Sequence, residues 1–293
     1  MRSLCLPAAL LLGLPFAAGA ITVRDDVTDA QSQALAAVSG SAVGNLTRPG
    51  DSVSGVLIDP RFVLTAAHVT GGAAQNAFTF AIGSSTYQSV RYVVNPAYTG
   101  DSASGHDLAI IELDREVTDV APALLYNGTA EVGVEATVVG FGIGGNGTSG
   151  GTLPRGVKRA ATNVIDSTSY LTFTSNRLLF IDFDAVGVPA SILENKTGTP
   201  TATTFEGLIA LFDSGGGVFG TIGGQNYLLG INSFVIGDSD NISFNYGDVG
   251  GATRISSNYA FITGVIPEPS TAALAAMGAA MIGFRRRRQQ RLS

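Results

Sequence analysis

The sequence predicts an all-β fold, and three of its features lead to that prediction. Gly accounts for 38 of the 293 residues, only 14% of the residues are charged, and Val, Ile, Thr and Ser are frequent. This composition favours strands joined by tight turns over helices. Short apolar runs recur between clusters of Gly, Asn, Asp and Ser, as is typical of a sandwich or a barrel. Strand-like and helix-like segments do not alternate, which disfavours a parallel sheet.

The apolar, β-branched runs give the expected strands in chain order. They cover residues 53–58, 62–65, 78–82, 90–94, 108–113, 136–139, 178–183 and 227–234. The segment 116–133 is partly polar and rich in turn-forming residues, so we expect it to link two halves of the domain.

The N-terminal segment 1–20 predicts a secretory signal peptide. Arg2 is followed by an apolar run, and the segment ends in the small residues Ala18-Gly19-Ala20. A basic start, an apolar middle and a small-residue end are the three parts of such a signal. We therefore expect cleavage before Ile21 and an exported protein whose main domain covers residues 21–266.

The C-terminal segment 267–293 has three parts in order. Pro267-Glu268-Pro269 precedes an apolar run at 271–284, and four arginines follow at 285–288. Basic residues after an apolar helix stay on the cytoplasmic side of a membrane. As a helix, the run spans roughly 21 Å, which is short for a transmembrane helix in a core of about 30 Å.

This order of motif, short helix and arginine cluster resembles the PEP-CTERM sorting tail of bacterial envelope proteins. The resemblance implies recognition by an exosortase-type processing enzyme and a transient anchor in the inner membrane. It implies a destination in the cell envelope or outside the cell. An ordinary tail anchor is the alternative, and it would leave the protein in the same compartment.

Charge and cysteine content exclude several classes of protein. All 23 acidic residues but only 11 of the 17 basic ones lie between positions 21 and 270, so this part carries a formal charge near −12. Nucleic acid is therefore not expected as a partner. The single cysteine, Cys5, lies in the signal segment, which excludes a disulfide-stapled scaffold. No cofactor is expected and no cluster of metal ligands is visible; the acidic stretch 237–241 is interpreted as a solvated turn rather than a calcium site.

Three residues form a candidate catalytic set. His68 ends the stretch VLTAAH, Asp107 lies in HDLAIIEL, and Ser214 lies in DSGGG. A serine hydroxyl is a poor nucleophile at neutral pH, so it needs an imidazole to accept its proton and a carboxylate to orient that imidazole. Each residue alone has a structural explanation, but the ordered set of three points to nucleophilic catalysis.

These motifs resemble those of the trypsin-like, chymotrypsin-fold serine proteases. Two further stretches, LLGINSFV at 228–235 and GGATRISSNYAFI at 250–262, are similar to the pocket-lining strand and the segment before the closing helix of that family. The similarity extends over about residues 40–265. It implies two antiparallel six-stranded β-barrels with the active site in the cleft between them.

The resemblance also assigns roles to residues. It implies that Ser214 is the nucleophile, His68 the general base and acid, and Asp107 the residue that orients His68. Ser233 is expected in the substrate pocket and hydrogen-bonded to Asp107. His106, next to Asp107 on a strand, should face the other way and is not expected to act as the base.

The sequence departs from the family at two places that matter. The oxyanion hole is expected from the backbone N–H groups of Phe212 and Ser214, but the family has Gly where Phe212 stands. Phe212 either biases its peptide away from the hole or sits unstrained and walls the substrate cleft. The Ile-Val-Gly-Gly start of the family is also missing, although Ile21 is expected to approach Asp213 if it becomes the N-terminus.

The expected function is an exported serine endopeptidase that works through an acyl-enzyme. Leu208 is expected at the floor of the substrate pocket, which predicts apolar residues such as Leu, Phe or Tyr at P1. The alternatives are a catalytically weak or inactive protease-fold protein that binds a partner or an envelope polymer, and an esterase with the same triad.

Overall fold

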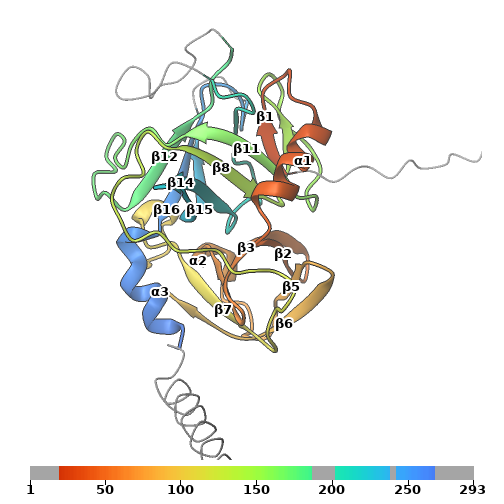
Figure 1. Ribbon diagram of the computed structural model, residues 1–293, viewed down its shortest axis with the longest axis vertical. Helices are drawn as coiled ribbons and strands as arrows, with labels where there is room; N and C mark the ends of the chain where they lie inside the picture. Colours follow the sequence, from red (N-terminus) through yellow and green to blue (C-terminus); the bar gives the residue numbers. More distant parts are fainter. Residues whose placement is uncertain (1–19, 187–201, 238–241, 268–293) are drawn as a thin grey trace, which may run out of the picture.

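The computed structural model describes residues 20–186, 202–237 and 242–267. They form two β-rich halves, one built around strands β2 to β7 and the other around β8 to β16 (Figure 1). All of the expected signal peptide except Ala20, the proposed membrane segment 271–284 and most of the acidic stretch 237–241 lie outside the described residues. Within the described part, no helix is long and apolar enough to cross a membrane.

The first half is a closed antiparallel barrel in the strand order β2-β3-β4-β7-β6-β5. Its strands are β2 (Val43–Arg48), β3 (Asp51–Asp59), β4 (Phe62–Thr65), β5 (Thr79–Ile82), β6 (Ser85–Val94) and β7 (Ala109–Leu113). Alternating apolar side chains point inward, and Leu46, Val56, Leu64 and Phe80 have no exposed surface. The hairpin between β2 and β3 turns at Gly50, whose φ of +83° favours glycine.

The second half is a six-stranded antiparallel sheet in the order β11-β8-β14-β15-β16-β12. Its strands are β8 (Glu135–Gly140), β11 (Arg159–Val164), β12 (Leu178–Asp182), β14 (Gly217–Ile222), β15 (Gln225–Ile236) and β16 (Val249–Arg254). The two six-stranded β units confirm the predicted fold class. Between them, residues 114–134 contain no named helix or strand and connect β7 to β8, where the sequence predicted a link.

A small four-stranded sheet was not predicted. It has the order β10-β9-β1-β13 and contains β1 (Ile21–Val23), β9 (Gly144–Asn146), β10 (Gly150–Leu153) and β13 (Gly207–Leu208). β1 pairs in parallel with β9 and antiparallel with β13. β9, β10 and β13 are very short and rich in Gly, and β1 has only three residues, so no alternating pattern marks these strands in the sequence. The sheet fixes Ile21 close to the loop that carries Ser214.

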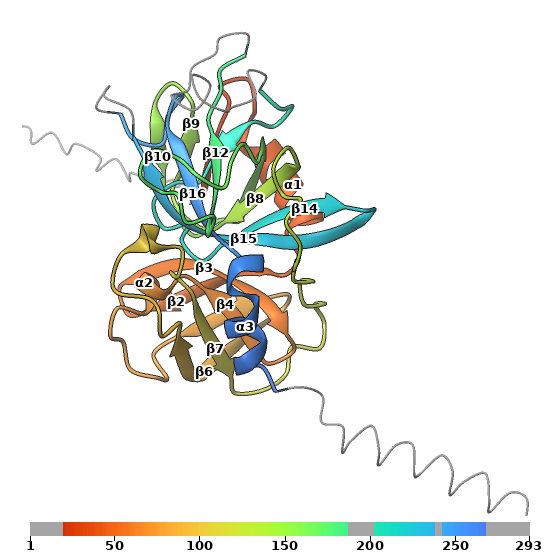
Figure 2. The same cartoon turned by 90° about the vertical axis from the view of Figure 1, so that its left-hand side faces the viewer.

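Three short helices complete the fold. α1 (Asp29–Ser39) begins at a capping box between Thr28 and Gln31 and packs on β11. α2 (Ala67–Thr70) follows β4 directly, and α3 (Tyr259–Val265) lies against the first barrel in both views (Figure 2). Two single-turn 3₁₀ helices, η1 (Ser102–Ser104) and η2 (Ser256–Asn258), precede β7 and α3.

Candidate active site

His68 is the second residue of α2, which follows β4 after a tight turn. The buried strand β4 leads into Ala66 and Ala67, whose small side chains let the chain turn tightly into α2. The backbone N–H of His68 donates to Oδ1 of Asp107 over 2.8 Å. The imidazole is about one third exposed, so it can meet both a buried partner and a ligand from solvent.

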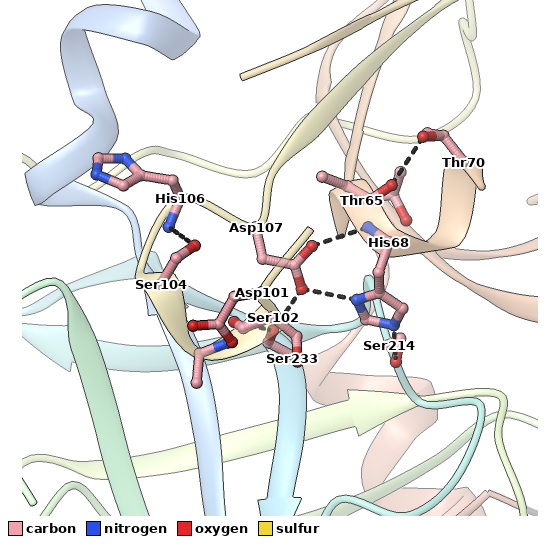
Figure 3. Close-up of polar contacts among 12 residues, drawn as sticks. Thr65, His68, Thr70, Asp101, Ser102, Ser104, His106, Asp107, Ser214 and Ser233 are labelled. Atoms are coloured by element: carbon pink, nitrogen blue, oxygen red, sulfur yellow. Dashed lines mark hydrogen bonds and ion pairs between the residues drawn. The ribbon is translucent and has the colours of Figure 1, made fainter. Parts of the chain in front are cut away.

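Asp107 lies just before β7 and its side chain has no exposed surface. Its Oδ2 is 2.7 Å from Nδ1 of His68 and 2.5 Å from the hydroxyl of Ser233 on β15 (Figure 3). A buried carboxylate needs donors to offset its lost hydration, and His68 and Ser233 supply three of them. Because the carboxylate accepts from Nδ1–H, Nε2 of His68 is left with a free lone pair.

Ser214 lies on the turn before β14, and its Oγ is 2.8 Å from Nε2 of His68. The turn is docked on the first barrel, because the N–H of Ser54 donates to the carbonyl of Ser214 over 3.0 Å. Gly215 has a φ of +84°, and a Cβ there would collide with the carbonyl of Ser54 and the hydroxyl of Thr65. Only glycine fits this contact, so the DSGGG stretch is a packed turn and not a flexible one.

Phe212 adopts a backbone conformation that glycine prefers, with a φ of +72°. The carbonyl of Leu211 accepts from the N–H of Ile143 over 2.8 Å. In a trans peptide the N–H of Phe212 points away from that carbonyl, and therefore away from Ile143. Among the described residues, neither Phe212 N–H nor Ser214 N–H donates to a protein acceptor, so both can bind a developing negative charge.

Asp213 is completely buried between these residues. Its Oδ2 accepts from the N–H of Ala210 over 2.8 Å and lies 3.2 Å from the nitrogen of Ile21, and its Oδ1 accepts from Gly142 over 2.8 Å. Burial raises the pKa of this carboxyl to about 7, and the three backbone donors oppose that rise. Asp213 therefore ties the start of β1 to the turn that carries Ser214.

The other three residues discussed from the sequence, Ser233, His106 and Leu208, lie at different positions around the site. Ser233 contacts Asp107 as predicted, and its hydroxyl also lies 3.0 Å from the carbonyl of Ser102. His106 points away from His68 and Ser214 (Figure 3). Leu208 lies in β13 beside β1, has no exposed surface and also packs under Gly250 of β16.

Two residues at the site, Arg155 and Ile143, could not be identified as site residues from the sequence. The Arg155 guanidinium lies 4.1 Å from the centre of the Phe212 ring, and Ile143 holds the Leu211 carbonyl. Both belong to the Gly-rich region 140–156, which looks like a flexible loop when the sequence is considered alone. In the described part of the chain, no three His, Cys, Asp or Glu side chains lie together in a way that could hold a metal ion.

Comparisons with known proteins identify the family and the fold. The PEP-CTERM protein-sorting motif matches residues 265–289. A solved structure of mouse neuropsin, "a serine protease expressed in the limbic system of mouse brain", is similar in fold, with a TM-score of 0.59 and 19% identity over 84% of this chain and 99% of neuropsin. No curated protein sequence matches the chain. The trypsin family model matches residues 28–262, which is most of the chain, and the protein therefore belongs to the trypsin family.

Proposed function

We propose that this protein is an exported serine endopeptidase. The observation that carries the proposal is the continuous line of hydrogen bonds from Ser214 Oγ through His68 to Asp107, with distances of 2.8 and 2.7 Å. A hydroxyl, an imidazole and a buried carboxylate in this order can activate the serine at neutral pH.

The proposed reaction assigns a role to each of these groups. Ser214 Oγ attacks the carbonyl carbon of the substrate, and Nε2 of His68 accepts the hydroxyl proton. The negative charge that develops on the substrate oxygen is bound by the N–H groups of Phe212 and Ser214. His68 then donates its proton to the leaving amine, which gives an acyl-enzyme, and water activated by His68 releases the acid.

Asp107 and Ser233 prepare His68 for these steps. Asp107 accepts from both the backbone N–H and Nδ1 of His68, so it fixes the orientation and tautomer of the ring. The Ser233 hydroxyl holds the carboxylate from the opposite side. An imidazole that turns positive during the reaction is stabilised by the adjacent negative charge.

The conformation of Phe212 weakens the case for an inactive, partner-binding protein. That alternative rested on the replacement of Gly by Phe at the oxyanion hole. Phe212 adopts a positive φ in spite of its side chain, so the bulky residue does not prevent the glycine-like turn. The geometry therefore favours an enzyme over a degenerate binding module.

The proposed P1 preference is for apolar side chains. Leu208 packs under Gly250 on β16, next to a hollow of about 10 Å³ that no charged residue lines. A lysine or arginine side chain would be buried there without a partner, which is costly.

The N-terminal contacts support cleavage between Ala20 and Ile21. Ile21 has a φ of +62°, a strained conformation for a β-branched residue that is joined to a preceding residue. A chain that begins at Ile21 has no such constraint, and its α-amino group would lie beside Asp213. Ala20 has no exposed surface, so we expect the cut to precede folding, during export.

We further propose that the tail at 267–293 directs the protein to the envelope. Its sorting motif implies an exosortase-type partner, and the run 271–284 is the proposed transient anchor in the inner membrane. The protease domain is proposed to cover residues 21–266, with the signal at 1–20.

Hydrolysis of casein and of an apolar peptide ester by the purified exported protein tests the proposed function. Ser214→Ala should remove several orders of magnitude of rate while leaving the circular dichroism spectrum unchanged. Activity that survives this change would assign the hydrolysis to a different group.

A further inference from the structure

The positive φ of Phe212 requires stabilising contacts from other residues. A side chain disfavours positive φ, because Cβ crowds the neighbouring carbonyl in that conformation. The φ of +72° therefore has to be stabilised by contacts elsewhere. On the backbone side, the Ile143 N–H binds the Leu211 carbonyl and fixes one face of the 211–212 peptide.

On the side-chain side, Arg155 supplies the second contact. Its guanidinium lies 4.1 Å from the centre of the Phe212 ring, well inside the range of a cation–π interaction. The ring is partly buried and packs against the core of the first barrel. The ring is therefore held between an apolar surface and a planar cation.

Both terminal nitrogens of the Arg155 guanidinium have hydrogen-bond partners. Nη1 lies 2.7 Å from Oδ1 of Asp51, and Nη2 donates to the carbonyl of Gly50 over 3.1 Å. Both partners belong to the tight β2–β3 hairpin, and Arg48 lies 3.3 Å from the other oxygen of Asp51. The Asp51–Arg155–Phe212 series thus connects the β2–β3 hairpin of the first barrel to the turn that carries Ser214.

We propose that Arg155 is a positioning residue that holds the Phe212 N–H in the oxyanion hole. This inference rests on the proposed function, because it assigns a role in the same site. A glycine at position 212 would reach positive φ without assistance. With phenylalanine at position 212, the contact of Arg155 with the ring opposes relaxation of the peptide to negative φ.

The arrangement also predicts how the role divides between kcat and KM. The Phe212 N–H matters most when negative charge develops on the substrate oxygen, so weakening its alignment lowers kcat more than it raises KM. If Arg155 and Phe212 only formed a wall for the substrate, loss of Arg155 would raise KM and leave kcat in place.

The experiment compares Arg155→Ala and Arg155→Lys with wild type, in the natural background and in a Phe212→Gly background. We expect Arg155→Ala to lower kcat by about tenfold, part of the roughly 100-fold loss seen when one donor of such a hole is deleted. Arg155→Lys should lose nearly as much, because lysine keeps the charge but not the planar fork. In the Phe212→Gly background, Arg155→Ala should change kcat by less than about twofold, because no strained side chain remains to be held.

Arg115→Ala is the matched control. Arg115 lies 4.5 Å from the ring centre of Tyr87 and binds Asp114 and the carbonyl of Thr86, so it makes the same kinds of contact far from Ser214. We expect this variant to keep the kcat and KM of wild type.

Amide hydrogen exchange gives a readout that does not need turnover. Residues 210–215 should exchange faster in Arg155→Ala than in wild type, and at the wild-type rate in Arg115→Ala. Unchanged exchange in this loop, an unchanged kcat in Arg155→Ala, a fully active Arg155→Lys, or an equal loss in both backgrounds would each overturn the inference. A wild-type protein without hydrolytic activity would instead refute the proposed function, and the exchange measurement would still decide whether Arg155 holds the loop.

Discussion

The backbone nitrogen of Ile21 lies 3.2 Å from Oδ2 of Asp213, a carboxyl that has no contact with solvent. Asp213 directly precedes Ser214, so a change at the start of β1 is transmitted to the turn that carries the nucleophile. In an uncut chain the contact is an amide hydrogen bond. In a chain that begins at Ile21 it becomes an ion pair in a buried environment.

The first prediction concerns this N-terminus. A protein that begins at Ile21 should be at least tenfold more active than one that keeps a single extra residue, Ala20, because an amide in the chain carries no positive charge to pair with Asp213. Edman sequencing or mass spectrometry establishes the terminus, and initial rates on a peptide ester give the comparison. Equal activity of the two forms, or no inhibition on acetylation of Ile21, would refute the coupling.

The second prediction concerns the pH dependence of stability. In the uncut chain, burial raises the pKa of Asp213 to about 7 from 3.8. The folded chain then keeps a proton that the unfolded chain releases, so the free energy of unfolding is highest below about pH 4 and falls as the pH rises to 7. Three pKa units correspond to an upper limit of about 4 kcal/mol.

Urea unfolding between pH 4 and 7.5 measures this slope. Asp213→Asn should flatten it in a chain that retains residues before Ile21. Burial also raises the pKa of Glu206 to about 8, so Glu206 too makes the free energy of unfolding fall as the pH rises. The test is therefore the difference in slope between Asp213→Asn and its parent. In the chain that begins at Ile21, the α-amino group should favour the carboxylate and weaken the decline. Identical slopes for Asp213→Asn and its parent would contradict this account of the buried carboxyl.

The third prediction concerns Phe212→Gly. Because Phe212 already has a positive φ, replacement by glycine should not raise kcat. The ring is also proposed to wall the substrate cleft, so its removal should raise KM severalfold. Steady-state kinetics on one apolar ester decides the matter, and a higher kcat in the variant would mean that phenylalanine impairs the oxyanion hole.

The fold class and the candidate triad could be predicted from the sequence because both depend on local patterns. The eight expected strands correspond to β3 to β8, β12 and β15, whose apolar runs are long enough to be recognised. Strands such as β9, β13 and β14 are short or Gly-rich, and a capping box is the main sequence signal of α1. These elements depend on tertiary pairing more than on their own periodicity.

The contacts that could not be predicted join residues far apart in the chain. Arg155 and Phe212 lie in the separate segments before β11 and β14, and no spacing rule connects them. The positive φ of Phe212 is likewise invisible in the sequence, where only the departure from glycine can be seen. The contact of Ile21 with Asp213 was expected from the family resemblance, whereas the strain at Ile21 was not.

The fourth prediction concerns substrate preference. Cleavage of an unbiased peptide library should occur after apolar residues such as Leu, Phe or Tyr, and cleavage after Lys or Arg should be rarer by about 100-fold or more, because a buried cation without a partner costs several kcal/mol. Mass spectrometry of the products identifies the P1 residue. Predominant cleavage after Lys or Arg would show that the hollow beside Gly250 is not the P1 site.

The central claim is that Ser214 is an activated nucleophile, and reaction with a fluorophosphonate probe tests it most directly. In the purified protein that begins at Ile21, the account predicts one labelled residue, Ser214. His68→Ala should slow labelling by several orders of magnitude, and Ser214→Ala should abolish it. A folded wild-type protein that is not labelled, or is labelled at another residue, would contradict the assignment of the His68–Asp107–Ser214 triad.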